Sequence, residues 1–310
     1  MNAPESPAEG QPRIPHSAPP VLAPPVLAPP LLALALPPTA LSVAAPAMEP
    51  GRRWRWRTHL LLMAAYPVVL GLGAWAGRFD HESGPALSHG ARGLLIVCAL
   101  ELGIFGTVFG LAWLASRASR DDLLLRWRGG LLPVPLGLGY SIALRLGILL
   151  VAVIVAAIAL ALGVISLDSM GRFALANRPD VETLVDVPAM RHNPAYYWLT
   201  LTLVSFVVAG LREELWRSAC IAGMRKLWPR WFGSRWGQLG AAGAAALLFG
   251  LGHLPQGPIA VCMTTLLGLG LGAIMVLHRS LWPAVIAHGL FDATSLAIIP
   301  FVIDKLPKLH

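Results

Sequence analysis

Charged residues are scarce in this chain of 310 residues: Asp, Glu, Lys and Arg make up 13% of it, against about a quarter in ordinary soluble domains. Hydrophobic residues make up 56%, and several long runs are nearly free of charge. This composition excludes a soluble globular domain and predicts a multi-pass membrane protein. The net charge of +8 does not indicate nucleic-acid binding, because excess Lys and Arg in membrane proteins mostly marks cytoplasmic loops.

Three further absences narrow the function. The cysteines Cys98, Cys220 and Cys262 all lie in apolar segments without a Cys-x-x-Cys pair, which argues against a disulfide framework or a zinc finger. The chain also lacks His-Glu-x-x-His, the zinc-binding helix motif of many metalloproteases. No inverted sequence repeat of the kind common in transporters is present.

The first 50 residues form a separate region that repeats a short Pro-rich unit, "APPVLAPPVLAPPLLALALPP". Its prolines remove helix donors every few residues. No basic region precedes it, so it does not read as a signal sequence. We expect a disordered or polyproline-like tail.

The remaining apolar runs predict an all-α bundle of about seven or eight transmembrane helices. The expected spans are 58–77, 93–115, 140–166, 196–224, 238–255, 259–277 and 281–301. The segment "LLPVPLGLGY" before the third span is a candidate for an extra re-entrant or interfacial piece. We divide the chain into the tail 1–50, the N-terminal membrane helices 51–190 and a core 191–303.

Basic residues predict the orientation of these spans. The stretch "GRRWRWR" before the first span reads as an interface anchor on the cytoplasmic side. The loops "SRASRDDLLLRWRGG" and "RKLWPRWFGSR" each carry four basic residues, and we place both inside the cell with the N-terminus. The protein is therefore expected to be integral to the membrane, and to the plasma (inner) membrane if the chain is bacterial.

A few ionisable residues lie inside the expected spans, where they are costly and usually face a bundle interior or a watery cavity. Three spans hold most of them: Glu213, Glu214 and Arg217 in the fourth, His253 in the fifth, and His288 with Asp292 in the seventh. At 1.5 Å of rise per residue, they fall at overlapping depths of roughly 12 to 22 Å from the cytoplasmic ends. This convergence predicts a single site.

Local spacing supports the same site. Glu213 and Arg217 are four residues apart on one helix face, and Glu214 and Arg217 are three apart. An arginine at these spacings favours the ionised form of a nearby carboxylate. His288 and Asp292 are four apart, so the carboxylate can orient the imidazole. Each residue also has a structural interpretation: a lone histidine often satisfies a nearby polar group, and the acid–arginine pair can serve packing alone.

Two other ionisable residues, Glu101 and Arg145, stand alone in their spans and have no motif around them. We interpret both as packing or cavity residues.

At these residues the chain resembles the CPBP family of intramembrane proteases, which includes CaaX prenyl proteases and Abi-type bacteriocin-processing proteins. The family carries Glu-Glu-x-x-x-Arg, Phe-x-x-x-His and His-x-x-x-Asn or Asp on successive membrane helices, in this order. The matching residues are Glu213 and Glu214 for the first motif, Phe249 and His253 for the second, and His288 and Asp292 for the third. The resemblance covers about the last third of the chain.

The chain departs from the first motif by one position. The family spacing places the arginine at 218, but that residue is Ser218 and the arginine is Arg217. A shift of one residue rotates the guanidinium by about 100° around the helix, so we expect its partner to become Glu213 rather than Glu214. At the end of the third motif stands Asp292, where many members have asparagine.

The resemblance implies peptide hydrolysis within the membrane. Glu213 would be the general base that activates water, and His253 would help to hold that water. His288 and residue 292 would lie near the oxyanion. An ionised Asp292 cannot donate to an oxyanion, so it is protonated, orients His288 or binds a metal. The implied partners are the lipid bilayer and a peptide or protein substrate, which is prenylated for the CaaX-processing members.

Two histidines and a carboxylate also form a common catalytic zinc set, so a divalent metal held by His253, His288 and Asp292 stays an alternative to a site that requires no cofactor. We favour the metal-free glutamate mechanism because the sequence shows no second-shell zinc signature. Two alternatives of another class remain. The same residues can form a proton relay in a transporter, or belong to a catalytically silent membrane scaffold.

Overall fold

The computed structural model describes residues 49–77, 87, 90–177 and 184–303. In this part of the chain the structure is helical, and its one extended pairing is an isolated bridge between Leu87 and Val185. The predicted all-α class is confirmed for these residues. The predicted Pro-rich tail lies almost wholly outside them.

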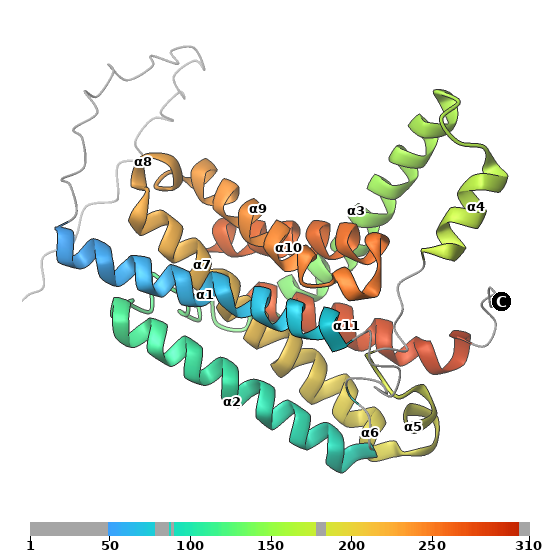
Figure 1. The fold of residues 1–310 in the computed structure, drawn as a ribbon, viewed down its shortest axis with the longest axis horizontal. Coiled ribbons are helices and arrows are strands. Elements are labelled where there is room, and N and C mark those ends of the chain that lie inside the picture. Colours follow the sequence, from blue (N-terminus) through green and yellow to red (C-terminus); the bar gives the residue numbers. More distant parts are fainter. Residues whose placement is uncertain (1–48, 78–86, 88–89, 178–183, 304–310) are drawn as a thin grey trace, which may run out of the picture. The chain divides into compact units, whose positions relative to one another are not determined.

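Figure 1 shows the arrangement of the helices. In chain order they are α1 (Pro50–Gly77), α2 (Gly90–Ser116), α3 (Pro133–Ala161), α4 (Leu167–Ala176), α5 (Val187–His192), α6 (Pro194–Leu199), the π-helix η2 (Thr200–Leu211), α7 (Arg212–Leu227), α8 (Pro229–Phe232), α9 (Arg235–Leu251), the 3₁₀ turn η3 (Leu254–Gln256), α10 (Pro258–His278) and α11 (Trp282–Val302).

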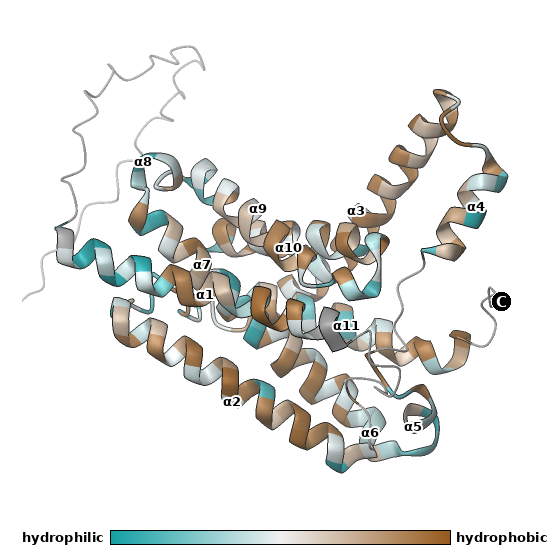
Figure 2. Cartoon of the chain, in the orientation of Figure 1, coloured by the Kyte–Doolittle hydropathy of each residue, from teal (hydrophilic) through white to brown (hydrophobic). Residues whose placement is uncertain are grey.

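Five helical segments in the described residues are long and apolar enough to cross a membrane. They are α2, α3, the continuous stretch Pro194–Leu227, α10 and α11, and Figure 2 shows the apolar residues along α2 and α3. The protein is thus an integral membrane protein. The other two expected spans correspond to α1, which begins in the basic stretch, and to α9, which has 17 residues. A total of seven or eight spans stays a prediction.

The third span begins earlier than the sequence suggested. We expected it at 140–166 after a separate short piece, but α3 runs from Pro133 to Ala161. Proline suits the first turn of a helix because the N–H it lacks would have no helical partner there. The segment "LLPVPLGLGY" is therefore mostly the start of this helix, and the prediction of a separate piece is wrong.

The fourth span contains a conformation that its sequence did not indicate. We expected a helix over 196–224, whereas the segment passes through α6, then the π-helix η2, then α7. Within η2 the Ser205 hydroxyl donates to the carbonyl of Thr200, five residues back, at 3.0 Å. Such π segments frequently occur at functional sites, and this one ends where the charged run Arg212 to Arg217 begins.

Helix α11 lies against both η2 and α3, and α9 pairs with α10. The contact between α11 and η2 is so close at Gly289 that a Cβ there would overlap the ring of Phe206. This approach brings the third motif, on α11, beside the first turns of α7. Helix α1 packs on α2 and α7, where the buried His59 ring contacts the carbonyls of Ala112 at 3.0 Å and Ala219 at 3.1 Å.

Candidate active site

The first turns of α7 carry two adjacent glutamates in different environments. The side chain of Glu214 is fully buried, as is that of Arg217, and the two form a salt bridge. Glu213 keeps 17% of its side chain exposed and pairs instead with Arg212, at 3.0 Å. The expectation that Arg217 would turn toward Glu213 is wrong. Because α7 is a regular helix from Arg212 onward, Glu214 and Arg217 share one face at i,i+3.

His288 of α11 is the residue that connects the motifs. Its Nδ1 lies 2.9 Å from Oε1 of Glu214, and because a carboxylate accepts, Nδ1 donates. Its Nε2 faces two further carboxylates, Glu213 Oε2 at 3.7 Å and Asp292 Oδ2 at 3.5 Å. The orienting hydrogen bond to the imidazole therefore comes from Glu214 on another helix, and not from Asp292 four residues along α11.

Phe249 of α9 lies beside these groups and links them to the second motif. Its ring is 6.3 Å from the ring of His288 and 4.7 Å from that of His253, both edge to face. The guanidinium of Arg217 stacks over the same ring at 4.8 Å, a favourable contact for a cation in a desolvated place. Phe249 thus forms an apolar wall of the cluster.

His253 lies just beyond the end of α9, before the turn that contains Pro255. Its Nδ1 donates to the carbonyl of Phe249 at 2.9 Å, which leaves Nε2 as the acceptor of the neutral ring. Among the described residues, no ion pair joins His253 to Glu213 or Asp292, and no hydrogen bond joins it to His288. The structure therefore gathers Glu213, Glu214, Arg217, His288 and Asp292 closely, and His253 joins them through Phe249.

The buried side chain of Arg217 fits against α10 because a glycine, Gly268, lies beside it. A Cβ added at Gly268 would lie 3.3 Å from Nη2 of Arg217 and 3.1 Å from the Phe249 ring. The Nε and Nη2 atoms of Arg217 and Oε2 of Glu214 are buried without a hydrogen-bond partner in the described part of the chain. Since burying a polar atom unsatisfied costs about 1–3 kcal/mol, this pair is held in place by the packing around it.

Two residues that sequence reasoning set aside extend the cluster. Glu101 of α2 accepts a hydrogen bond from Arg212 at 2.8 Å, so it is connected through Arg212 to Glu213. Arg145 of α3 donates to the carbonyl of Phe291 at 2.5 Å and to the Thr294 hydroxyl, on either side of Asp292. In the sequence, the only sign that Glu101 and Arg145 belong near the cluster is that each is a charged residue inside an apolar span.

The residues do not fit a metal held by His253, His288 and Asp292. Among the residues that the structure describes, no three His, Cys, Asp or Glu side chains are grouped so that they could hold a metal ion. We therefore derive no chemical step through a metal.

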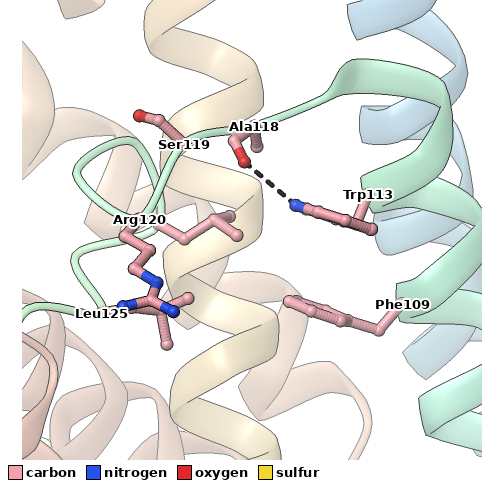
Figure 3. A pocket seen from close by; sticks show the side chains of 7 residues that line it. Phe109, Trp113, Ala118, Ser119, Arg120 and Leu125 are labelled. Atoms are coloured by element: carbon pink, nitrogen blue, oxygen red, sulfur yellow. Dashed lines mark hydrogen bonds between the residues drawn. The ribbon is translucent and has the colours of Figure 1, made fainter.

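A pocket of about 470 Å³ lies elsewhere, at the end of α2 and in the loop after it (Figure 3). It is lined by Phe109, Trp113, Ala118, Ser119, Arg120, Leu123 and Leu125. The Trp113 indole donates to the carbonyl of Ala118 at 3.0 Å and so ties this loop to α2. None of the motif residues lines this pocket.

One comparison with known proteins covers the stretch of the chain that carries the three motifs. Residues 194–294 match the family model described as "Type II CAAX prenyl endopeptidase Rce1-like". This segment is Rce1-like. The match runs from the start of α6 into α11 and contains every residue of the three motifs, so the predicted resemblance to the CaaX-type proteases is confirmed. No curated protein and no solved structure matches the chain.

Proposed function

We propose that this protein is an intramembrane endopeptidase that hydrolyses a peptide bond with water activated by Glu213. The observation that carries the proposal is the position of the Glu213 carboxylate. Its Oε1 is held by Arg212 at 3.0 Å, while its Oε2 faces Nε2 of His288 at 3.7 Å. Among the described residues, none donates a hydrogen bond to Oε2, so this oxygen is available to a water molecule.

The difference between the two glutamates assigns the base. Glu214 is fully buried and already occupied by Arg217 and His288. Glu213 is its neighbour in sequence, yet 17% of its side chain is exposed. A general base must come within hydrogen-bond reach of the proton that it takes, which Glu213 can do and Glu214 cannot.

The reaction then follows ordinary acyl-transfer chemistry. Glu213 takes a proton from water as the water oxygen bonds to the scissile carbonyl carbon, and the carbonyl oxygen becomes an oxyanion. The carbon–nitrogen bond breaks, and the proton held by Glu213 passes to the leaving amine. His288, whose Nδ1 donates to Glu214, can stabilise the oxyanion through Nε2–H when its ring is protonated at both nitrogens, together with Asp292 when that residue is protonated. His253 offers Nε2 to the attacking water.

The buried pair has a supporting role in this scheme. Glu214 holds the orientation of the His288 ring through Nδ1, as a carboxylate partner does in other catalytic sites. The positive charge of Arg217 offsets part of the desolvation cost of burying the ionised Glu214 carboxylate. A change at either residue would therefore act on catalysis through His288.

The substrate proposed first is a prenylated peptide ending in a CAAX sequence, because the matching family model is described as a CAAX prenyl endopeptidase. The site is on membrane-spanning helices, so the scissile bond must reach it from within the bilayer or from its surface. If the chain is bacterial, we place the enzyme in the inner membrane.

The test is cleavage of a quenched fluorescent CAAX peptide, prenylated and unmodified, by the full-length protein in lipid nanodiscs. Glu213→Gln cannot accept a proton and should lower kcat at least about 100-fold. The matched control is Asp168→Asn, which removes an exposed acid from α4 far along the chain from the motifs.

Two results would contradict the proposal. Cleavage by Glu213→Gln at the wild-type rate would remove this residue as the base. Absence of any cleavage by the wild type, together with proton flux across the nanodisc membrane or partner binding that survives Glu213→Gln, would instead favour a transporter or a silent scaffold.

A further inference from the structure

Glu101 lies in the middle of α2, inside an apolar span, and its carboxylate needs a partner there. The partner is Arg212, whose Nη1 donates to Oε2 of Glu101 at 2.8 Å. Glu101 keeps 38% of its side chain exposed.

Arg212 divides its guanidinium between two acids on two helices. Nη1 contacts Glu101, and the hydroxyl of Tyr66 on α1 is at the limit of hydrogen bonding, 3.5 Å away. Nη2 contacts only Oε1 of Glu213, at 3.0 Å. The third donor, Nε, is buried without a partner among the described residues.

This division is unusual in one respect. Arginine and a carboxylate frequently form a bidentate pair, in which two N–H groups engage both oxygens. Here Arg212 engages one oxygen of Glu213 through Nη2, while its Nη1 is bonded to Glu101 on α2. The other oxygen, Oε2, stays on the side of His288.

We propose that Glu101 and Arg212 are positioning residues that keep Oε2 of Glu213 free for water. Arg212 fixes the carboxylate through Oε1, and Glu101 prevents Arg212 from closing onto both oxygens. The inference rests on the proposed function, since it assigns to these residues the task of presenting the base.

The scheme predicts how each substitution acts. In Glu101→Gln, Nη1 loses its anionic acceptor, and Arg212 can form the bidentate pair with Glu213 that occupies Oε2. We expect kcat to fall about tenfold or more, since small misplacements of a catalytic group have effects of this size. KM should change less than about threefold, because neither residue is placed to contact substrate.

A second substitution makes the test specific. Lysine is a point charge and cannot form the two-pronged contact. The variant Glu101→Gln/Arg212→Lys should therefore be at least about threefold more active than Glu101→Gln, although it lacks both native groups. Glu101→Asp retains the charge one methylene shorter and should lie between the wild type and Glu101→Gln.

The experiment measures kcat and KM of these full-length variants in nanodiscs with the peptide that the wild type cleaves, alongside Glu213→Gln, Asp168→Asn and thermal unfolding of each. Loss of kcat in Glu101→Gln with recovery in the double variant supports the inference. Wild-type kcat in Glu101→Gln overturns it, as does a double variant less active than Glu101→Gln.

These outcomes separate the inference from the proposed function. If the wild type cleaves and Glu213→Gln does not, a negative result at Glu101 removes only the positioning role. If the wild type shows no Glu213-dependent cleavage, the proposed function is contradicted, and so is the positioning role that rests on it. If Glu101→Gln does not fold, Glu101→Asp decides: wild-type kcat there overturns the positioning role.

Discussion

The start of α7 and the middle of α3 each hold an arginine inside a membrane-spanning segment, and they accommodate its charge differently. Arg217 is fully buried and paired with the fully buried Glu214. Arg145 is half-buried and bonds to uncharged acceptors, among them the Ser141 hydroxyl at 2.7 Å and the Phe291 carbonyl at 2.5 Å. One arginine is thus bonded directly to an acid, and the other bonds to uncharged acceptors with the acid Asp292 nearby.

The packing around the two helices explains the difference. In the most apolar stretch of Pro194–Leu227 a third of the residues are buried, whereas none are in that of α3. On α7 other helices lie close on several sides, so an unpaired charge would be desolvated. On α3 the arginine reaches across to α11 alone. The acid–arginine pair therefore lies in the packed region around the three motifs, and Arg145 attaches α3 to that region.

The largest effect is expected where the acid–arginine pair is broken. Arg217→Met leaves Glu214 buried with His288 as its remaining partner, and this should lower the unfolding free energy by about 3–5 kcal/mol. The double variant Arg217→Met/Glu214→Gln removes both charges and should regain most of that stability, but not the activity, since the anion that holds His288 is absent. Unfolding in detergent and peptide cleavage measure the two effects. Equal instability of single and double variants would contradict the pairing argument.

Much of this cluster could be predicted from spacing along single helices. Glu214 with Arg217 and His288 with Asp292 lie on common faces because helical periodicity places them there. The contact of His288 with Glu214, and not mainly with Asp292, depends on how α11 is rotated against α7. Neighbouring sequence does not encode this rotation, which is set by close contacts such as that of Gly289 with Phe206.

The same limit applies to Glu101 and Arg145, which looked isolated because their partners lie 111 and 146 residues away in the chain. The sequence of η2, which is mostly apolar, also contains nothing that would have predicted a π-helix before Arg212. The expected fifth span, 238–255, was too long at its end, because α9 ends at Leu251 and His253 lies beyond it.

A smaller effect is expected at the arginine of α3. Arg145→Leu removes the hydrogen bonds to α11 and a favourable charge near Asp292, which keeps His288 as a neighbour at 3.5 Å. Thr294 and Ser295 still bond to carbonyls within their own helix. We expect a loss of about 1–2 kcal/mol in unfolding free energy, well below that of Arg217→Met. The same unfolding assay tests it, and a loss as large as that of Arg217→Met would remove the contrast between the two helices.

Asp292 separates the metal-free mechanism from a metal-dependent one. If no metal is involved, Asp292→Asn supplies a neutral donor near the oxyanion, and kcat should stay within about tenfold of the wild type. An amide is a far weaker metal ligand than a carboxylate, so a metal site would instead lose activity by orders of magnitude. Cleavage by the purified wild type and variant, with and without a chelator, decides between them together with metal analysis of both.

The smallest effect is expected outside the membrane-spanning segments, at Asp122 in the loop after α2. Its carboxylate contacts Lys226 at 2.8 Å and Arg225 at 2.9 Å, beyond the core pair on the same helix. Burial raises the pKa of Asp122, but the hydrogen bonds from Lys226 and Ser119 and the charge of Lys226 outweigh it, so the pKa lies below its ordinary value. A carboxyl with a lowered folded-state pKa adds stability above its unfolded pKa of about 3.9, and this contribution is lost as the pH falls through the folded pKa.

Asp122→Asn should therefore lower the unfolding free energy at pH 7 by only about 0.2–1 kcal/mol, the range of partly exposed ion pairs. The difference between wild type and variant should shrink as the pH falls below about 4, and high salt should reduce it at pH 7. Unfolding in detergent at pH 7 and at the lowest pH where the protein stays soluble, each at two salt concentrations, measures this. A difference that persists unchanged at low pH would mean that Asp122 acts through packing of the loop and not through its charge.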